Sequence, residues 1–197
     1  MYRLSAFLCE WMYREEIIKE EELELSEYGL QITIANIINF MIMSTIGLAF
    51  GALWEMLLFY AVFVSLRVFC GGYHADSYGK CFCMFALTCT AAMLGRKMTA
   101  VQGVAQALAL TITALIQLFC ICKWAPMEHR NRPATVEEKS RFRKKSIWIF
   151  IFWTIAGIGL WHQQQYKFVT SVINGFLLVS IYMLVKKGED HCEKDRT

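Results

Sequence analysis

The sequence YGLQITIANIINFMIMSTIGLAFGAL, at residues 28–53, contains no Asp, Glu, Lys or Arg. A helix needs about 20 consecutive apolar residues to cross the hydrocarbon core of a bilayer, so this stretch is long enough to span a membrane. A second uncharged stretch follows at residues 98–122. Over the whole chain of 197 residues, 56% are hydrophobic and 19% are charged, whereas soluble domains carry about 25% charged residues. These observations exclude a water-soluble enzyme, a disordered chain and a nucleic-acid-binding domain with a basic face, and they predict a small polytopic membrane protein.

The hydrophobic pattern predicts an all-α membrane bundle that forms a single domain, residues 1–197. It has six hydrophobic segments, two of them short (56–68 and 81–94) and four long (28–53, 98–122, 146–165 and 168–185). A basic loop separates the first four segments from the last two, dividing the chain into residues 28–122, 123–145 and 146–187. Residues 1–27 are too rich in Glu to span a membrane, and we expect them to form one amphipathic helix at the membrane interface. The apolar side chains of this helix recur at helical spacing at Leu4, Phe7, Leu8, Trp11 and Ile18.

Positive charge predicts the orientation, because the cytoplasmic loops of membrane proteins carry an excess of Lys and Arg. If the N-terminus is cytoplasmic and all six segments cross, the outside receives only Arg96, Lys97 and Lys167 of the 20 basic residues. This topology places both termini, residues 67–80 and the basic loop at residues 123–145 on the cytoplasmic side of the cell membrane. If the two short segments are re-entrant instead, Arg96 and Lys97 move inside.

Residues 67–81, RVFCGGYHADSYGKC, combine reactive and charged side chains between two hydrophobic segments. Ionisable groups are costly inside or at the edge of a membrane, so those found there are candidate functional residues. In this stretch they are Arg67, His74, Asp76 and Cys81. A Cys paired with a His is the minimum for thiol catalysis, in which the imidazole takes the thiol proton and the thiolate attacks a carbonyl. This pair predicts an enzyme with a cysteine nucleophile.

Catalysis by this pair requires a break in the helix. In one continuous helix, His74 and Cys81 would lie about 10.5 Å apart along the axis, beyond hydrogen-bond reach. Glycines at positions 71, 72 and 79 allow a turn that brings His74 back toward Cys81. Asp76 or Ser77 then caps the next helix, and the N–H groups and dipole of that helix would favour the Cys81 thiolate.

The spacing of these residues resembles the Arg-x(3)-Gly-Gly-x-His-x(6)-Cys core of the accessory gene regulator B (AgrB) family. Members of this family are membrane-embedded cysteine endopeptidases that mature the autoinducing-peptide precursor AgrD in Gram-positive quorum sensing. The resemblance extends to the chain length, the N-terminal amphipathic helix and the hydrophobic layout. It also includes a basic loop that begins at Ala125-Pro126 and ends near Arg132-Pro133.

The resemblance implies a role for each residue of the core. It implies that Cys81 is the nucleophile and His74 its base, with supporting positions at Arg67, Gly71 and Gly72. It implies no secure third catalytic residue to orient His74. Asp76 lies very near His74 in sequence, and a backbone carbonyl is an alternative group that could orient the imidazole. The family further implies a homodimer that works without a cofactor.

The implied reaction removes the C-terminal tail of the precursor through a Cys81 acyl-enzyme thioester and supports cyclisation of the product to a thiolactone or lactone. Precursors of this family carry an amphipathic leader and an acidic tail. We expect membrane lipids and the N-terminal helix to hold the leader. The tail has candidate binding residues in the basic loop, at Arg130, Arg132, Arg141, Arg143, Lys144 and Lys145.

Alternatives stay open at these residues. Cys83 is the rival nucleophile, but two positions along a helix turn it about 200° from Cys81, so only one of the two can face His74. The pairs Cys81-Phe-Cys83 and Cys120-Ile-Cys122 suggest a soft metal ion, yet a helix splays the thiols of a C-x-C pair, and we expect no metal at the site. An alternative role for Arg67 is structural, with its side chain extending to the lipid headgroups. The alternative function is a non-catalytic transporter or sensor that uses its embedded Cys and His residues.

Overall fold

The computed structural model describes residues 2–15, 17–19, 22–71, 77–98, 103–127 and 135–194. Within them the chain forms seven α-helices and no β-strand. Six of these helices are long and apolar enough to cross a membrane, which confirms the expected polytopic helical bundle. The helices are α1 (Tyr2–Arg14), α2 (Leu23–Ala49), α3 (Leu53–Cys70), α4 (Tyr78–Met98), α5 (Val104–Trp124), α6 (Val136–His162) and α7 (Tyr166–Lys194).

The N-terminal helix is shorter than the sequence predicted. We expected one helix over residues 1–27, but α1 ends at Arg14 and α2 already begins at Leu23. Five Glu between residues 15 and 22 put like charges one helical turn apart, and such pairs destabilise a continuous helix. The first membrane helix therefore begins five residues earlier than the predicted start at Tyr28.

The basic stretch at residues 123–145 is not a loop throughout, which corrects a second prediction. Helix α5 continues to Trp124 and α6 begins at Val136. Thr135 starts α6 with a capping box, in which its side chain accepts the Glu138 N–H and the Glu138 side chain accepts the Thr135 N–H. The two segments predicted to be short are helices of 18 and 21 residues, so both are long enough to span.

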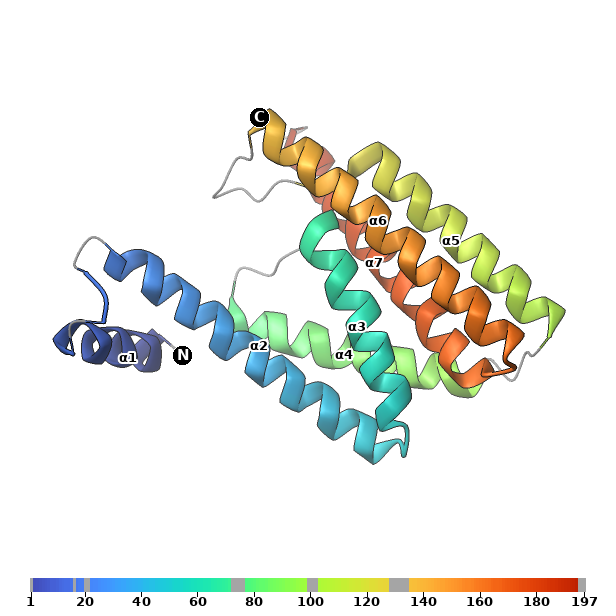
Figure 1. The fold of residues 1–197 in the computed structure, drawn as a ribbon, viewed down its shortest axis with the longest axis horizontal. Helices are drawn as coiled ribbons and strands as arrows, with labels where there is room; N and C mark the ends of the chain where they lie inside the picture. The colour runs from blue at the N-terminus through green and yellow to red at the C-terminus, as the bar shows by residue number, and fades with distance from the viewer. Residues whose placement is uncertain are drawn as a thin grey trace.

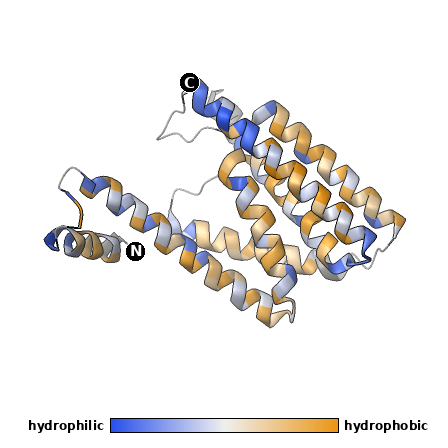
Figure 2. Cartoon of the chain, in the orientation of Figure 1, coloured by the Kyte–Doolittle hydropathy of each residue, from blue (hydrophilic) through white to orange (hydrophobic). Residues whose placement is uncertain are grey.

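Helix α7 lies at the centre of the bundle and contacts α3, α4, α5 and α6 (Figure 1). Helices α5, α6 and α7 lie side by side, while α2 lies at the edge, against α3 and α4, with α1 beside its first half. Of the six candidate spans, α7 is the most buried within the chain and α2 the least. The wide exposed surface of α2 is mostly apolar, as expected for a helix in lipid (Figure 2).

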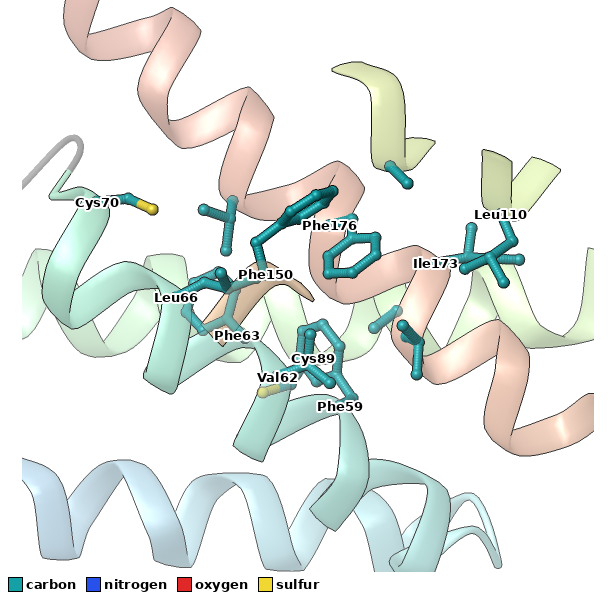
Figure 3. Packing of buried hydrophobic residues seen from close by; sticks show 14 of the residues in the cluster. Phe59, Val62, Phe63, Leu66, Cys70, Cys89, Leu110, Phe150, Ile173 and Phe176 are labelled. Atoms are coloured by element: carbon teal, nitrogen blue, oxygen red, sulfur yellow. The ribbon is translucent and has the colours of Figure 1, made fainter. Parts of the chain in front are cut away.

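The core forms where α3 meets α7 (Figure 3). Phe59 and Phe63 stack in α3 with ring centroids 5.7 Å apart, and Phe150 of α6 meets Phe176 of α7 at 5.4 Å. Gly175 permits the close approach of α7 to α3, because a Cβ at this position would lie 2.5 Å from Cγ1 of Val62. Small residues serve this purpose in membrane helices, where close packing replaces the hydrophobic effect as the source of association.

Hydrogen bonds between helices complete the bundle. A buried polar group has few other partners in a membrane, so each such bond favours one arrangement of its two helices. The bonds join α6 to α3 (Trp153 Nε1 to Ser65 Oγ, 2.8 Å), α5 to α7 (Gln106 Nε2 to Thr170 Oγ1, 3.0 Å) and α7 to α4 (Asn174 Nδ2 to the Ala92 carbonyl, 3.0 Å).

The helices alternate in direction, so α2, α4 and α6 begin at the same end of the bundle at which α3, α5 and α7 end (Figure 1). We name this the basic end, since its described residues include Lys123, Arg141, Arg143, Lys144, Lys145, Lys186 and Lys187. The opposite end has Arg96, Lys97 and Lys167 in its helices. This arrangement matches the predicted alternation in which all six segments cross.

Candidate functional site

Cys81 lies in the first turn of α4, at the basic end of the bundle. Its N–H donates to the Ser77 carbonyl (3.0 Å), and the Ser77 hydroxyl accepts the N–H of Lys80 (3.4 Å). Ser77 is therefore a cap of α4, as the sequence predicted for either Asp76 or Ser77. A thiol in the first turn of a helix lies near the positive end of the helix dipole, which favours a thiolate.

The thiol of Cys81 is half-buried and lies on the face of α4 that packs into the bundle. Residues at i, i+4 and i+7 share one face of a helix, and here Cys81 is followed by Phe85 and Thr88, both buried. The neighbouring Cys83 is exposed. The two cysteines of the C-x-C pair thus have different surroundings, and the inward position belongs to Cys81.

Arg67 lies in the last turn of α3 and extends over aromatic rings of the core. Its Cζ is 4.4 Å from the ring centroid of Tyr182 and 5.9 Å from that of Phe63. The guanidinium and the Cys81 sulfur interact electrostatically. The structure therefore brings together two of the predicted site residues, and an opposite charge in a water-poor region stabilises a thiolate.

Gly71 ends α3 and begins the connection to α4. Its N–H donates to the Arg67 carbonyl (2.9 Å), and its backbone has φ 76° and ψ −154°, a conformation that is essentially restricted to glycine. The Cys70 carbonyl accepts the Met127 N–H (2.9 Å), and a Cβ on Gly71 would lie 2.6 Å from the Met127 carbonyl oxygen. Both local geometry and tertiary packing thus require glycine at this position.

Several predicted site residues lie outside the described residues. These are His74 and Gly72 of the core, together with Asp76, Arg130 and Arg132. The pairing of His74 with Cys81 stays a prediction. The connection that contains His74 is bounded by Gly71 on one side and by Ser77, the cap of α4, on the other.

The remaining predicted basic residues lie on the first turns of α6, where Arg141, Arg143, Lys144 and Lys145 are exposed at the basic end (Figure 2). The ring of Phe69 links this surface to the site, because Lys145 Nζ lies 5.3 Å from its centroid and the Phe142 ring lies 6.1 Å from it. Phe69 is two residues from Arg67 in α3. The start of α6 therefore packs beside the end of the helix that carries Arg67.

The other described cysteines are free thiols with structural surroundings. Cys9, Cys70, Cys89 and Cys120 are buried, and Cys122 is exposed. Among the described residues, no group of three or more His, Cys, Asp or Glu side chains is placed to hold a metal ion. The side chains of Cys120 and Cys122 differ in exposure just as Cys81 and Cys83 do, which agrees with the splayed thiols expected of C-x-C in a helix.

Sequence reasoning missed Tyr182, whose ring contacts Arg67 from the distant helix α7, and Thr88, which meets the Tyr182 hydroxyl from α4. The Tyr182 hydroxyl and Thr88 Oγ1 are 2.6 Å apart, although 94 positions separate the two residues. No local sequence pattern predicts a contact between residues so far apart. A tyrosine in a hydrophobic span is the available signal, because its hydroxyl needs a partner when buried.

The fold and the site define a class: a multi-pass helical membrane protein with a half-buried thiol in the first turn of one span and a guanidinium close to it in another. The chain belongs to the accessory gene regulator B family, whose model matches residues 5–183. It is similar to a protein of Clostridium perfringens strain SM101 described as AgrB-like, with 25% identity over 182 residues that cover 89% of this chain and 85% of the relative.

A second relative, from C. perfringens strain 13, is also described as AgrB-like and is 23% identical over 177 residues, covering 86% of this chain and 83% of the relative. No solved structure matches the chain. Membership of the family assigns the protein a general role in the agr quorum-sensing system, as a multi-pass membrane protein of a family of peptide-processing enzymes.

Proposed function

We propose that this protein is a cysteine endopeptidase that removes the C-terminal tail of an AgrD-like precursor through a Cys81 acyl-enzyme thioester. The observation that carries the proposal is the position of Cys81, which is half-buried, in the first turn of α4 and electrostatically coupled to Arg67. Two features that favour a thiolate thus coincide at one residue, a helix N-terminus and a nearby cation.

In the first half of the reaction, the Cys81 sulfur attacks the carbonyl carbon of the scissile peptide bond. His74 takes the thiol proton and then gives it to the leaving nitrogen, so that the carbon–nitrogen bond breaks and the tail departs with a free amine. The rest of the precursor stays on the enzyme as a thioester of Cys81. Arg67 stabilises the negative charge on sulfur before the attack.

In the second half, a Cys thiol or Ser hydroxyl within the bound precursor attacks the thioester carbonyl. The bond to Cys81 breaks, a thiolactone or lactone ring closes, and the proton of the attacking group returns to Cys81. Exchange of one thioester for another is nearly balanced in energy, so the competing reaction to suppress is hydrolysis. Holding the chain near the attacking group and limiting access of water both favour cyclisation.

The acidic tail of the precursor binds, in this proposal, to the basic surface at the start of α6. Arg141 and Lys144 lie three residues apart and are exposed, which places both side chains on adjacent turns. The basic end is cytoplasmic by the positive-inside rule, and the leader lies on lipid there. The protein acts as a homodimer in the same proposal, as the family implies.

Charge reversal tests the docking of the tail. The double variant R141E/K144E should raise KM for the precursor about 2- to 30-fold at low salt, because an exposed ion pair contributes about 0.2–1 kcal/mol. Rising ionic strength should remove most of the difference. The matched control is K167E at the opposite end, which should leave KM unchanged. Equal KM values for both reversals would exclude this docking surface.

Covalent capture tests the catalytic proposal itself. The full chain in nanodiscs is mixed with a precursor whose internal Cys is replaced by Ala, so that the thioester accumulates, and intact-mass spectrometry then locates the adduct. The adduct should lie on Cys81. C81A and H74A should abolish tail release, whereas C83A, two residues away and exposed, should retain it. Cleavage by C81A together with loss of cleavage in C83A would refute the assignment.

A further inference from the structure

Tyr182 of α7 contacts both helices that carry the candidate site. Its hydroxyl lies 2.6 Å from Thr88 Oγ1 of α4, and its ring meets Phe63 of α3 edge to face, with centroids 5.6 Å apart. The Cζ of Arg67 lies 4.4 Å from the centroid of the same ring. One side chain thus joins the helix of the guanidinium to the helix of the nucleophile.

The hydroxyl contact has a defined direction. Thr88 Oγ1 donates its single proton to the Met84 carbonyl, 2.7 Å away in the preceding turn of α4. Its oxygen is then an acceptor, and Tyr182 is the donor in the contact between them. A donated hydrogen bond at one end and the edge of Phe63 against the ring fix the tilt of the tyrosine, so that its π face is presented to Arg67.

The position of Thr88 also indicates how α4 is rotated about its own axis. It lies seven residues after Cys81, which is about two helical turns and returns to the same face of the helix. A rotation of α4 that moved Cys81 away from the bundle would also carry Thr88 away from Tyr182. The contact at Thr88 therefore fixes the face of α4 on which the thiol lies.

We propose that Tyr182 is a positioning residue. Its ring holds the Arg67 guanidinium near Cys81, and its hydroxyl fixes which face of α4 packs toward α7. A cation in a water-poor region needs a compensating partner, and an aromatic face supplies one without neutralising the charge. A carboxylate in the same place would compete with the thiolate for Arg67. The proposal rests on the function proposed for Cys81.

A double-mutant cycle tests the coupling between Tyr182 and Arg67. The readout is the rate of Cys81 alkylation by iodoacetamide in the full chain in nanodiscs, with the exposed Cys83 as internal reference. Y182L should slow the reaction of Cys81 relative to Cys83 about 5- to 30-fold, the range expected of a cation–π contact away from water. In the R67Q background, Y182L should change the ratio less than twofold. Equal effects of Y182L in both backgrounds would overturn the proposal.

Conservative variants separate positioning from general packing. Y182F keeps the ring but removes the hydroxyl, and it should slow the reaction of Cys81 by no more than about threefold, because the cation–π contact persists and only the hydrogen bond to Thr88 is lost. The control Y60L removes a tyrosine that packs on Phe40 and Phe85 in the same bundle, and should leave the ratio unchanged. A loss in Y60L as large as in Y182L would assign the effect to packing and overturn the proposal.

Precursor cleavage provides the second readout. Y182L should lower kcat by a factor similar to that in alkylation while KM changes less than twofold, because Tyr182 acts on Arg67 rather than on the precursor. A rise in KM with kcat unchanged would contradict a positioning role. If the unchanged chain fails to cleave an AgrD-like precursor, the proposed function fails, while the alkylation cycle still decides whether Tyr182 acts through Arg67.

Discussion

Replacing Gly71 with Ala should be among the most damaging single-methyl changes in the chain. Two costs combine at this residue. The first is backbone strain, because φ 76° with ψ −154° is a conformation that a side chain disfavours by about 1–3 kcal/mol. The second is the contact with Met127: the new Cβ would lie 2.6 Å from a carbonyl oxygen, so one backbone segment must move.

The two costs are separable with the glycines that the chain offers. Gly103 has φ 69°, but a methyl group added there would meet nothing within 4 Å, so G103A carries the strain alone and should cost about 1–3 kcal/mol. Gly79 lies in α4, also with open space around it, and G79A should be neutral or stabilising by up to about 1 kcal/mol. Crowding by the Met127 backbone should add about 1–3 kcal/mol, which makes about 2–6 kcal/mol for G71A.

The assay is the free energy of unfolding from SDS titration of the full chain in mixed micelles, with loss of helical circular dichroism as the signal. The expected order of stability is G79A, then G103A, then G71A. A value for G71A equal to that for G103A would refute the contribution of the Met127 contact. A value for G71A equal to that for G79A would refute the strained backbone as well.

Two further changes test features of the bundle by the same titration. T135A removes the cap of α6 and should cost about 0.5–2 kcal/mol, whereas T135S keeps the hydroxyl and should cost little; equal losses would rule out the capping box. G175A places a methyl group 2.5 Å from Val62 and should cost about 1–3 kcal/mol. Adding V62A should then cost less than V62A does in the unchanged chain, and strict additivity would contradict the close approach of α7 to α3.

The length of the apolar stretches was enough to predict the long membrane helices, because the bilayer itself imposes the required number of apolar residues, whereas the segments at residues 56–68 and 81–94 were predicted too short. The predicted segments and the observed helices correspond one to one. Their ends differ for a local reason: charged residues can continue a helix beyond the hydrocarbon. Thus α6 begins at Val136, ten residues before the predicted start at Ser146, with Arg141 and Lys145 on its first turns. The capping signal Thr135-Val-Glu-Glu138 was readable in the sequence and marks that start.

The reactive and charged residues of the site were predictable from the sequence, but the residues that hold them in place were not. Arg67 and Cys81 stand 14 positions apart, and a motif can span that distance. Tyr182 and Thr88 are 94 positions apart and meet only because α7 lies against both α3 and α4. Periodicity in a membrane helix shows which residues are apolar, but apolar residues face both lipid and core, so it does not show which face packs inward.

The position of Cys81 reconciles two opposed requirements of the proposed reaction. A charged peptide tail must reach the enzyme from water, which favours a site at the end of the bundle, near Arg141 and Lys144. The thioester must last until the ring closes, which favours a site shielded from water. A thiol in the first turn of a membrane helix, half-buried on its inward face, satisfies both. The exposed Cys83 lacks the shielding, and it points away from the inward face of α4 on which Cys81 lies. On this reasoning the depth of the nucleophile, and not only its chemistry, determines whether the product is a ring or a hydrolysed chain.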